Sequence, residues 1–70
     1  MTTNWSTLLG TKTSVNNVER FSKGEMSGRT FYAKYTNTTN GGVVRGLFRT
    51  HGVEVSRQLA KKALSRRGLV

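Results

Sequence analysis

The stretch RTFYAKYTN, residues 29–37, gives the clearest indication of secondary structure in this 70-residue chain. It is rich in aromatic and β-branched residues, which are enriched in strands because they pack well on a pleated, half-buried surface. The stretch TTNGG at residues 38–42 follows directly, and its Asn-Gly-Gly end supplies the positive φ angles that a hairpin turn needs. Together the two stretches predict a β-strand that leads into a hairpin.

Two further stretches complete the predicted sheet. VERFS at residues 18–22 alternates in polarity and ends at Lys23 and Gly24, and residues 24–28 are typical of a turn. VVRGLFR at residues 43–49 predicts the third strand, in which Gly46 marks a bulge or a close approach. The pattern therefore predicts three antiparallel strands.

A helix is predicted from about Val53 to Arg66, because apolar and small residues recur there at a helical period. Gly68 is expected to stop it. Residues 1–14 are rich in Thr, Ser and Asn and carry one charge, so we expect a flexible arm whose Trp5, Leu8 and Leu9 could dock on the rest. The expected fold class is α+β. A three-stranded antiparallel sheet packs against one C-terminal helix (βββα), with the arm at residues 1–14 and a small basic domain at residues 15–70.

Strand alternation divides the predicted sheet into two faces. The inner face would pack on the helix and form the core, with Phe21, Phe31, Ala33, Tyr35, Val44 and Phe48. The outer face would hold Arg20, Tyr32, Lys34, Thr36, Arg45 and Arg49, with Leu47 as the one misfit. No acid falls on this outer face, whereas an ordinary solvated face normally mixes charges of both signs.

Charge is the main guide to function. The chain has 12 Lys and Arg against 3 acids, a net charge of +9 and a sequence pI of about 11.4. Such a balance indicates a polyanionic partner, because neutralised phosphates supply most non-specific affinity for nucleic acid. The chain has no Cys, so no disulfide or thiolate metal site can stabilise its thin core. No apolar run approaches the roughly 20 residues of a membrane span.

Several short motifs follow one another within residues 18–64: RFSKG at 20–24, TFYAKY at 30–35, GLFRT at 46–50 and LAKKAL at 59–64. TFYAKY is similar to the x-Tyr-x-Ala-x-Tyr middle strand of integrases, and GLFRT to their Gly-x-Phe-x-Thr ending. In this order the chain resembles the N-terminal, arm-type DNA-binding domains of tyrosine recombinases, and also the plant ethylene-response-factor domain. The resemblance implies that the sheet enters the major groove and contacts DNA through Arg20, Lys34, Arg45 and Arg49, assisted by Tyr32 and Thr36. Without a recombinase catalytic domain, the chain is expected to be a free-standing module.

We therefore expect a small, non-enzymatic protein that binds duplex DNA, a regulator or an accessory protein of a phage or mobile element. It would act in the cytoplasm, on the nucleoid or in the host cytoplasm if phage-encoded, without a metal or cofactor. The expected nucleic-acid-binding residues are Arg20, Lys23, Arg29, Tyr32, Lys34, Thr36, Arg45, Arg49 and Lys61.

Other functions stay open. Tyr32 on a basic face could stack a base of RNA or single-stranded DNA, and the charge also suits an acidic host protein that the chain would inhibit. A membrane-surface helix is disfavoured, because the apolar stripe of residues 53–67 has no aromatic residue. An enzyme is disfavoured too, since the only His is His51, Cys is absent and the three Glu are dispersed.

Overall fold

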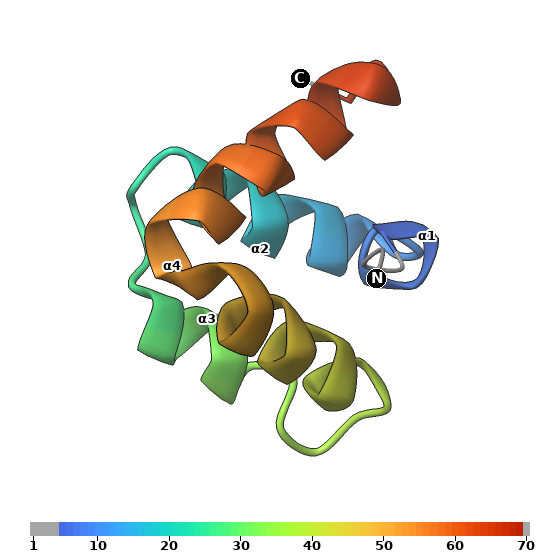
Figure 1. Cartoon of the computed structure of the whole chain (residues 1–70). Helices are drawn as coiled ribbons and strands as arrows, with labels where there is room; N and C mark the ends of the chain where they lie inside the picture. Colours follow the sequence, from blue (N-terminus) through green and yellow to red (C-terminus); the bar gives the residue numbers. More distant parts are fainter. Residues whose placement is uncertain (1–4, 70) are drawn as a thin grey trace.

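The computed structural model describes residues 5–69, which form four α-helices and contain no β-strand (Figure 1). The helices are α1 (Trp5–Leu8), α2 (Lys12–Ser22), α3 (Gly28–Ala33) and α4 (Asn40–Arg66). The expected α+β fold with a three-stranded sheet is therefore wrong: residues 18–22 lie in α2, residues 29–33 in α3 and residues 43–49 in α4. The expectation of DNA recognition by a sheet and the resemblance to integrase domains fail with it.

Side-chain caps explain why two of the predicted strands are helical. The Thr11 side chain accepts a hydrogen bond from the Ser14 N–H at 3.1 Å and begins α2. The Ser27 side chain accepts one from the Thr30 N–H at 3.1 Å and begins α3. Each such cap is worth about 1 kcal/mol. Strand propensity is weak and depends on context, so local caps and tertiary packing override it here.

The predicted hairpin turn at residues 40–42 is the first turn of α4, and its glycine serves packing instead. A Cβ atom on Gly41 would lie 2.5 Å from the carbonyl oxygen of Tyr35. The start of α4 thus fits closely against the end of the α3 region because residue 41 has no side chain.

Helix α4 consists of two segments that meet at a kink. Gly52 has φ 78° and ψ 173°, a backbone conformation that is essentially restricted to glycine. Residues 40–51 form the first segment and residues 53–66 the second, and the second is the helix expected from the sequence. Buried Ser56 spans the kink, donating a hydrogen bond to the Gly52 carbonyl, with the Leu47 carbonyl oxygen 3.4 Å away.

Aromatic rings from α2, the α3 region and α4 form the core. Phe21 and Phe31 stack with centroids 4.4 Å apart, Phe48 lies 5.7 Å from Phe21, and Tyr35 meets Phe31 edge-on at 5.2 Å. Most members of the expected core are buried, but Ala33 is exposed and Phe48 half-buried. Leu47, the misfit of the predicted sheet, is buried at 2% exposure because a helix places it on the inner side.

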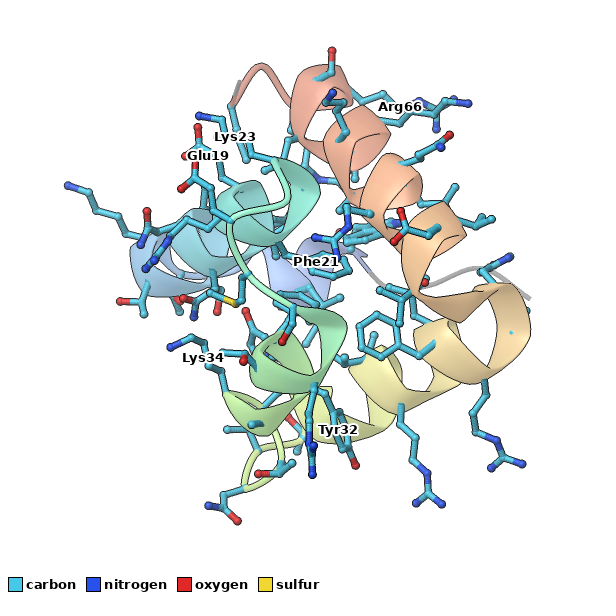
Figure 2. The ribbon with its side chains drawn as sticks, turned by 90° about the vertical axis from the view of Figure 1, so that its left-hand side faces the viewer. Glu19, Phe21, Lys23, Tyr32, Lys34 and Arg66 are labelled. Carbon is cyan, nitrogen blue, oxygen red and sulfur yellow. The ribbon has the colours of Figure 1, made fainter. Side chains whose placement is uncertain are left out.

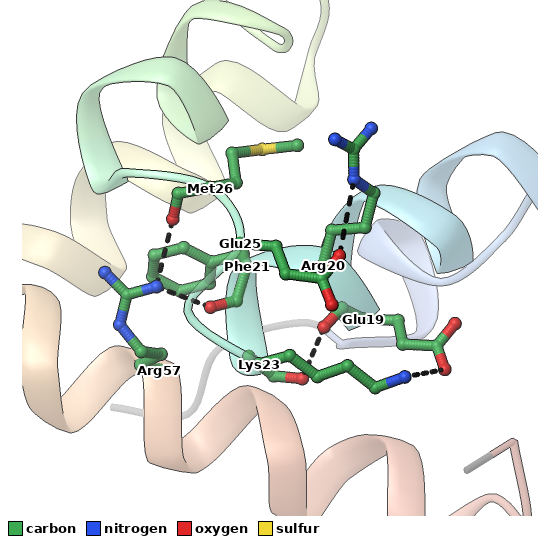
Figure 3. Close-up of polar contacts among 8 residues, drawn as sticks. Glu19, Arg20, Phe21, Lys23, Glu25, Met26 and Arg57 are labelled. Carbon is green, nitrogen blue, oxygen red and sulfur yellow. Dashed lines mark hydrogen bonds and ion pairs between the residues drawn. The ribbon is translucent and has the colours of Figure 1, made fainter.

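Arg57 turns inward from α4 and ties this helix to the turn after α2 (Figure 3). Its Nη1 donates to the Phe21 carbonyl at 2.6 Å and to the Met26 carbonyl at 3.0 Å. Its guanidinium carbon lies 4.6 Å from the centroid of the Phe21 ring, a cation–π distance. These contacts make Arg57 a structural residue, although it is basic.

The segment expected to be a flexible arm lies partly outside the described residues, which begin at Trp5. From there on it contains α1 and the first turn of α2. Leu8 is fully buried in the core, and Trp5 packs against it from α1.

Candidate nucleic-acid interface

Helix α3 and the first segment of α4 lie side by side and run antiparallel. At one end, a Cβ atom on Gly28 would lie 2.9 Å from a methyl group of Val53, and at the other end Gly41 abuts the Tyr35 carbonyl. Tyr32 follows Gly28 by four residues on α3, and Arg45 follows Gly41 by four residues on α4. At about 100° per residue, each of these side chains points about 40° further round its helix than the glycine position does. Because the two helices are antiparallel, both rotations lead to the same side of the pair, where Arg45 is exposed and Tyr32 is half-buried at the edge of the core.

This side carries a group of basic and aromatic residues that we call the α3–α4 face: Arg29, Tyr32, Arg45 and Arg49. Arg45 and Arg49 are one helical turn apart, as are Arg29 and Tyr32, and the three arginines are exposed. Figure 2 shows Tyr32 at the bottom of the view, where side chains that end in guanidinium groups also project from α4. The face presents positive charge beside a phenol ring.

The arginines of the α3–α4 face form no ion pair with any residue in the described part of the chain. Within residues 5–69 the ion pairs are Arg20 with Glu25 at 3.9 Å and Lys23 with Glu19 at 3.1 Å. The remaining acid, Glu54, is exposed and lies beyond the kink. Arg29, Arg45 and Arg49 therefore keep their charge available to a partner.

Two glycines adjoin the arginines on α4. Gly42 and Gly46 are exposed and one turn apart, and a Cβ atom built on either would meet no atom within 4 Å. Internal packing therefore does not require glycine at these positions, unlike at Gly41. The helix backbone is bare here, and a ligand could approach it closely.

The other residues expected to share one surface with Arg45 are dispersed. Arg20 and Lys23 lie at the end of α2, and their partners Glu25 and Glu19 are close by (Figure 3). Lys34 follows α3 and points to a different side from Tyr32 (Figure 2).

Thr36 is exposed in the turn after α3, where its hydroxyl donates to the Ala33 carbonyl at 3.2 Å. Lys61 is exposed on the second segment of α4, beyond the kink. The structure thus brings Arg29, Tyr32, Arg45 and Arg49 together and separates them from the remaining expected residues.

A second basic region lies outside the residues predicted as the nucleic-acid site. It surrounds a pocket of about 290 Å³ between α1 and the second segment of α4, which we call the Trp5 pocket. Its lining combines one indole, two aliphatic side chains and three cations: Trp5, Leu59, Ala63, Lys62, Arg66 and Arg67. The sequence signal that could have found it is the lone tryptophan, but nothing local indicates which helix it meets.

Comparison with known proteins gives no match: no family model fits the chain, and no similar curated protein or solved structure was found. Among residues 5–69, no group of three or more His, Asp or Glu side chains could hold a metal ion. The helices of this described part include none with the length and apolar character needed to cross a membrane.

Proposed function

We propose that this chain is a small nucleic-acid-binding protein that holds duplex DNA against the α3–α4 face. The observation that carries the proposal is the pair Arg45 and Arg49, exposed one turn apart, outside any ion pair within residues 5–69 and beside the bare backbone at Gly42 and Gly46. Arginine forms bidentate hydrogen bonds both with phosphates and with the guanine edge. A chain with a net charge of +9 adds long-range attraction to any polyanion.

The dimensions of the first segment of α4 suit a DNA groove. Its twelve residues, 40–51, span about 18 Å at a rise of about 1.5 Å per residue. The major groove is roughly 12 Å wide and admits an α-helix. Missing side chains at two positions of the exposed side bring the helix axis closer to the DNA and let the flanking arginines reach further.

Duplex DNA is favoured over a single strand at this face because of the state of Tyr32. Proteins that hold a single strand along a surface stack successive bases on several aromatic side chains. The α3–α4 face has one aromatic residue, Tyr32, which is half-buried.

The proposal is tested with two double variants that have the same total charge. One loses two charges from the α3–α4 face, and the control loses two charges elsewhere. The double variant Arg45→Gln/Arg49→Gln and the control Arg20→Gln/Lys23→Gln both lose two positive charges. Binding to a fluorescent duplex is measured by anisotropy over a range of salt concentrations, and folding is checked by circular dichroism. Each phosphate contact contributes about 0.9 to the slope of log K against log salt.

We expect the Arg45/Arg49 variant to lose at least about tenfold in affinity, with its salt slope reduced by about 2 if both residues contact phosphates. The control should change little, because ion pairs already occupy its two cations. Equal losses in both variants would mean that binding depends on total charge and not on this face. If the parent protein fails to bind duplex DNA but retains an acidic protein in a salt-sensitive way, the proposed function itself is refuted.

A further inference from the structure

The Trp5 pocket lies on the second segment of α4, away from the α3–α4 face. Contacts with the core hold its aromatic wall in place. Helix α1 is anchored by fully buried Leu8, and the Leu9 N–H donates to the Trp5 carbonyl at 2.8 Å. This turn holds the half-buried indole beside Leu59 and Ala63, which line the same pocket. The indole is therefore held in place by the core and still borders an open cavity.

The chemistry of the lining is that of a site for a flat, anionic group. Trp5 and the two aliphatic side chains provide an apolar wall, while Lys62, Arg66 and Arg67 bring three positive charges, and among residues 5–69 no Asp or Glu lines the pocket. The Arg67 guanidinium also donates to the Ala63 carbonyl at 3.4 Å, so its chain lies back along the helix toward the pocket. The volume of about 290 Å³ is just below the range of small-molecule sites, which run from roughly 300 to 1,000 Å³, and suits a small ligand group.

We propose that the Trp5 pocket binds an unpaired nucleotide of a single-stranded nucleic acid, with its base on the Trp5 indole and its phosphates at Lys62, Arg66 and Arg67. A base within a duplex is stacked between its neighbours and cannot enter a concave site, whereas an unpaired base can. The favourable position of Arg66 and Arg67 at the negative end of α4 accounts for two of the cations. This helix-end effect does not explain the indole beside the two arginines, whereas the base of a bound nucleotide would stack on it.

Trp5 is the only tryptophan in the chain, so fluorescence excited at the long-wavelength edge of tryptophan absorption, where the two tyrosines do not absorb, reports on this pocket. The probe is a hexamer of deoxyadenylate, and the matched control is an abasic hexamer with the same phosphates. We expect the adenine strand to quench Trp5 and the abasic strand to leave its fluorescence nearly unchanged. Equal quenching by the two strands would overturn the proposal, because the site would then recognise charge alone.

Variants separate the stacking contribution from the charge. In anisotropy measurements with a labelled adenine hexamer, Trp5→Leu should weaken binding by about tenfold, which is within the range measured for loss of one base–aromatic stack. Trp5→Phe should retain most of the affinity. Lys62→Gln/Arg66→Gln should weaken the same interaction, whereas Arg45→Gln/Arg49→Gln should leave Trp5 quenching intact.

The Arg45→Gln/Arg49→Gln variant separates the two proposals, because the Trp5 pocket can bind an unpaired nucleotide whether or not the α3–α4 face binds duplex DNA. Unchanged hexamer affinity in Trp5→Leu, with the fold retained by circular dichroism, would refute the pocket proposal. So would a blue shift of Trp5 emission with anionic phospholipid vesicles and no response to the adenine strand, since the pocket would then bind lipid. Either result would leave the duplex-binding proposal standing.

Discussion

Replacing Gly46 by alanine should make the protein more stable and at the same time a weaker DNA binder. Gly46 lies inside the first segment of α4 with an ordinary helical backbone, and a Cβ atom there meets no atom within 4 Å. Glycine is less favourable than alanine in a helix interior by about 0.8–1.0 kcal/mol. The variant should therefore gain about 1 kcal/mol in unfolding free energy, or about 4–8 °C in Tm for a domain of this size.

The matched control is Gly41→Ala in the same helix. A Cβ atom at residue 41 would lie 2.5 Å from the Tyr35 carbonyl oxygen, so the backbone would have to shift. Overpacking of this kind typically costs about 1–3 kcal/mol. Thermal and urea unfolding followed by far-UV circular dichroism would compare both variants with the parent.

The measurement discriminates between folds as well as between sites. Had residues 43–49 formed a strand with Gly46 at a bulge, alanine would destabilise the protein. A loss of stability in Gly46→Ala would thus refute the helical assignment of this segment. A gain in stability with unchanged affinity for duplex DNA would instead show that no ligand approaches the bare backbone at Gly46.

Two further substitutions test the internal framework. Gly52→Ala forces a side chain onto φ 78° and ψ 173° and should cost about 1–3 kcal/mol, seen as a lower urea midpoint; a neutral effect would mean that α4 has no such kink. Arg57→Ala removes a guanidinium from two backbone carbonyls and from the Phe21 ring and should cost about 2–3 kcal/mol. Lys61→Ala, an exposed change one turn away, should stay within about 0.5 kcal/mol of the parent, and equal effects of these last two would contradict the structural role of Arg57.

The sequence predicted the helix at residues 53–66 correctly because apolar and small residues recur along most of it at a helical period. Residues 29–37 are ambiguous: Phe31 and Tyr35 are four apart, which places them on one side of a helix as well as on one face of a strand. Whether residues 29–37 form a helix or a strand depends partly on contacts with residues outside this stretch. The close approach of Gly41 to the Tyr35 carbonyl cannot be read from the local pattern NGG, which favours a turn.

Residue spacing also explains which residues of the expected outer face lie on one side of the molecule. Arg45 and Arg49 are four residues apart, so both periods keep them on one side. Tyr32 and Lys34 are two apart, which is one face of a strand but about 200° round a helix, and the structure separates them accordingly. Core residues such as Phe21 and Val44 were predicted correctly because large apolar side chains are buried in either kind of element.

The kink at Gly52 relates the two proposed sites to each other. A straight helix over the 27 residues of α4 would be about 40 Å long, whereas the longest extent of the molecule is 26 Å. The α3–α4 face lies on one side of the kink and the Trp5 pocket on the other, so both fall within a span of about eight base pairs at about 3.4 Å each. The kink thus keeps the two proposed sites close enough for one small domain to carry both, one on each segment of the same helix.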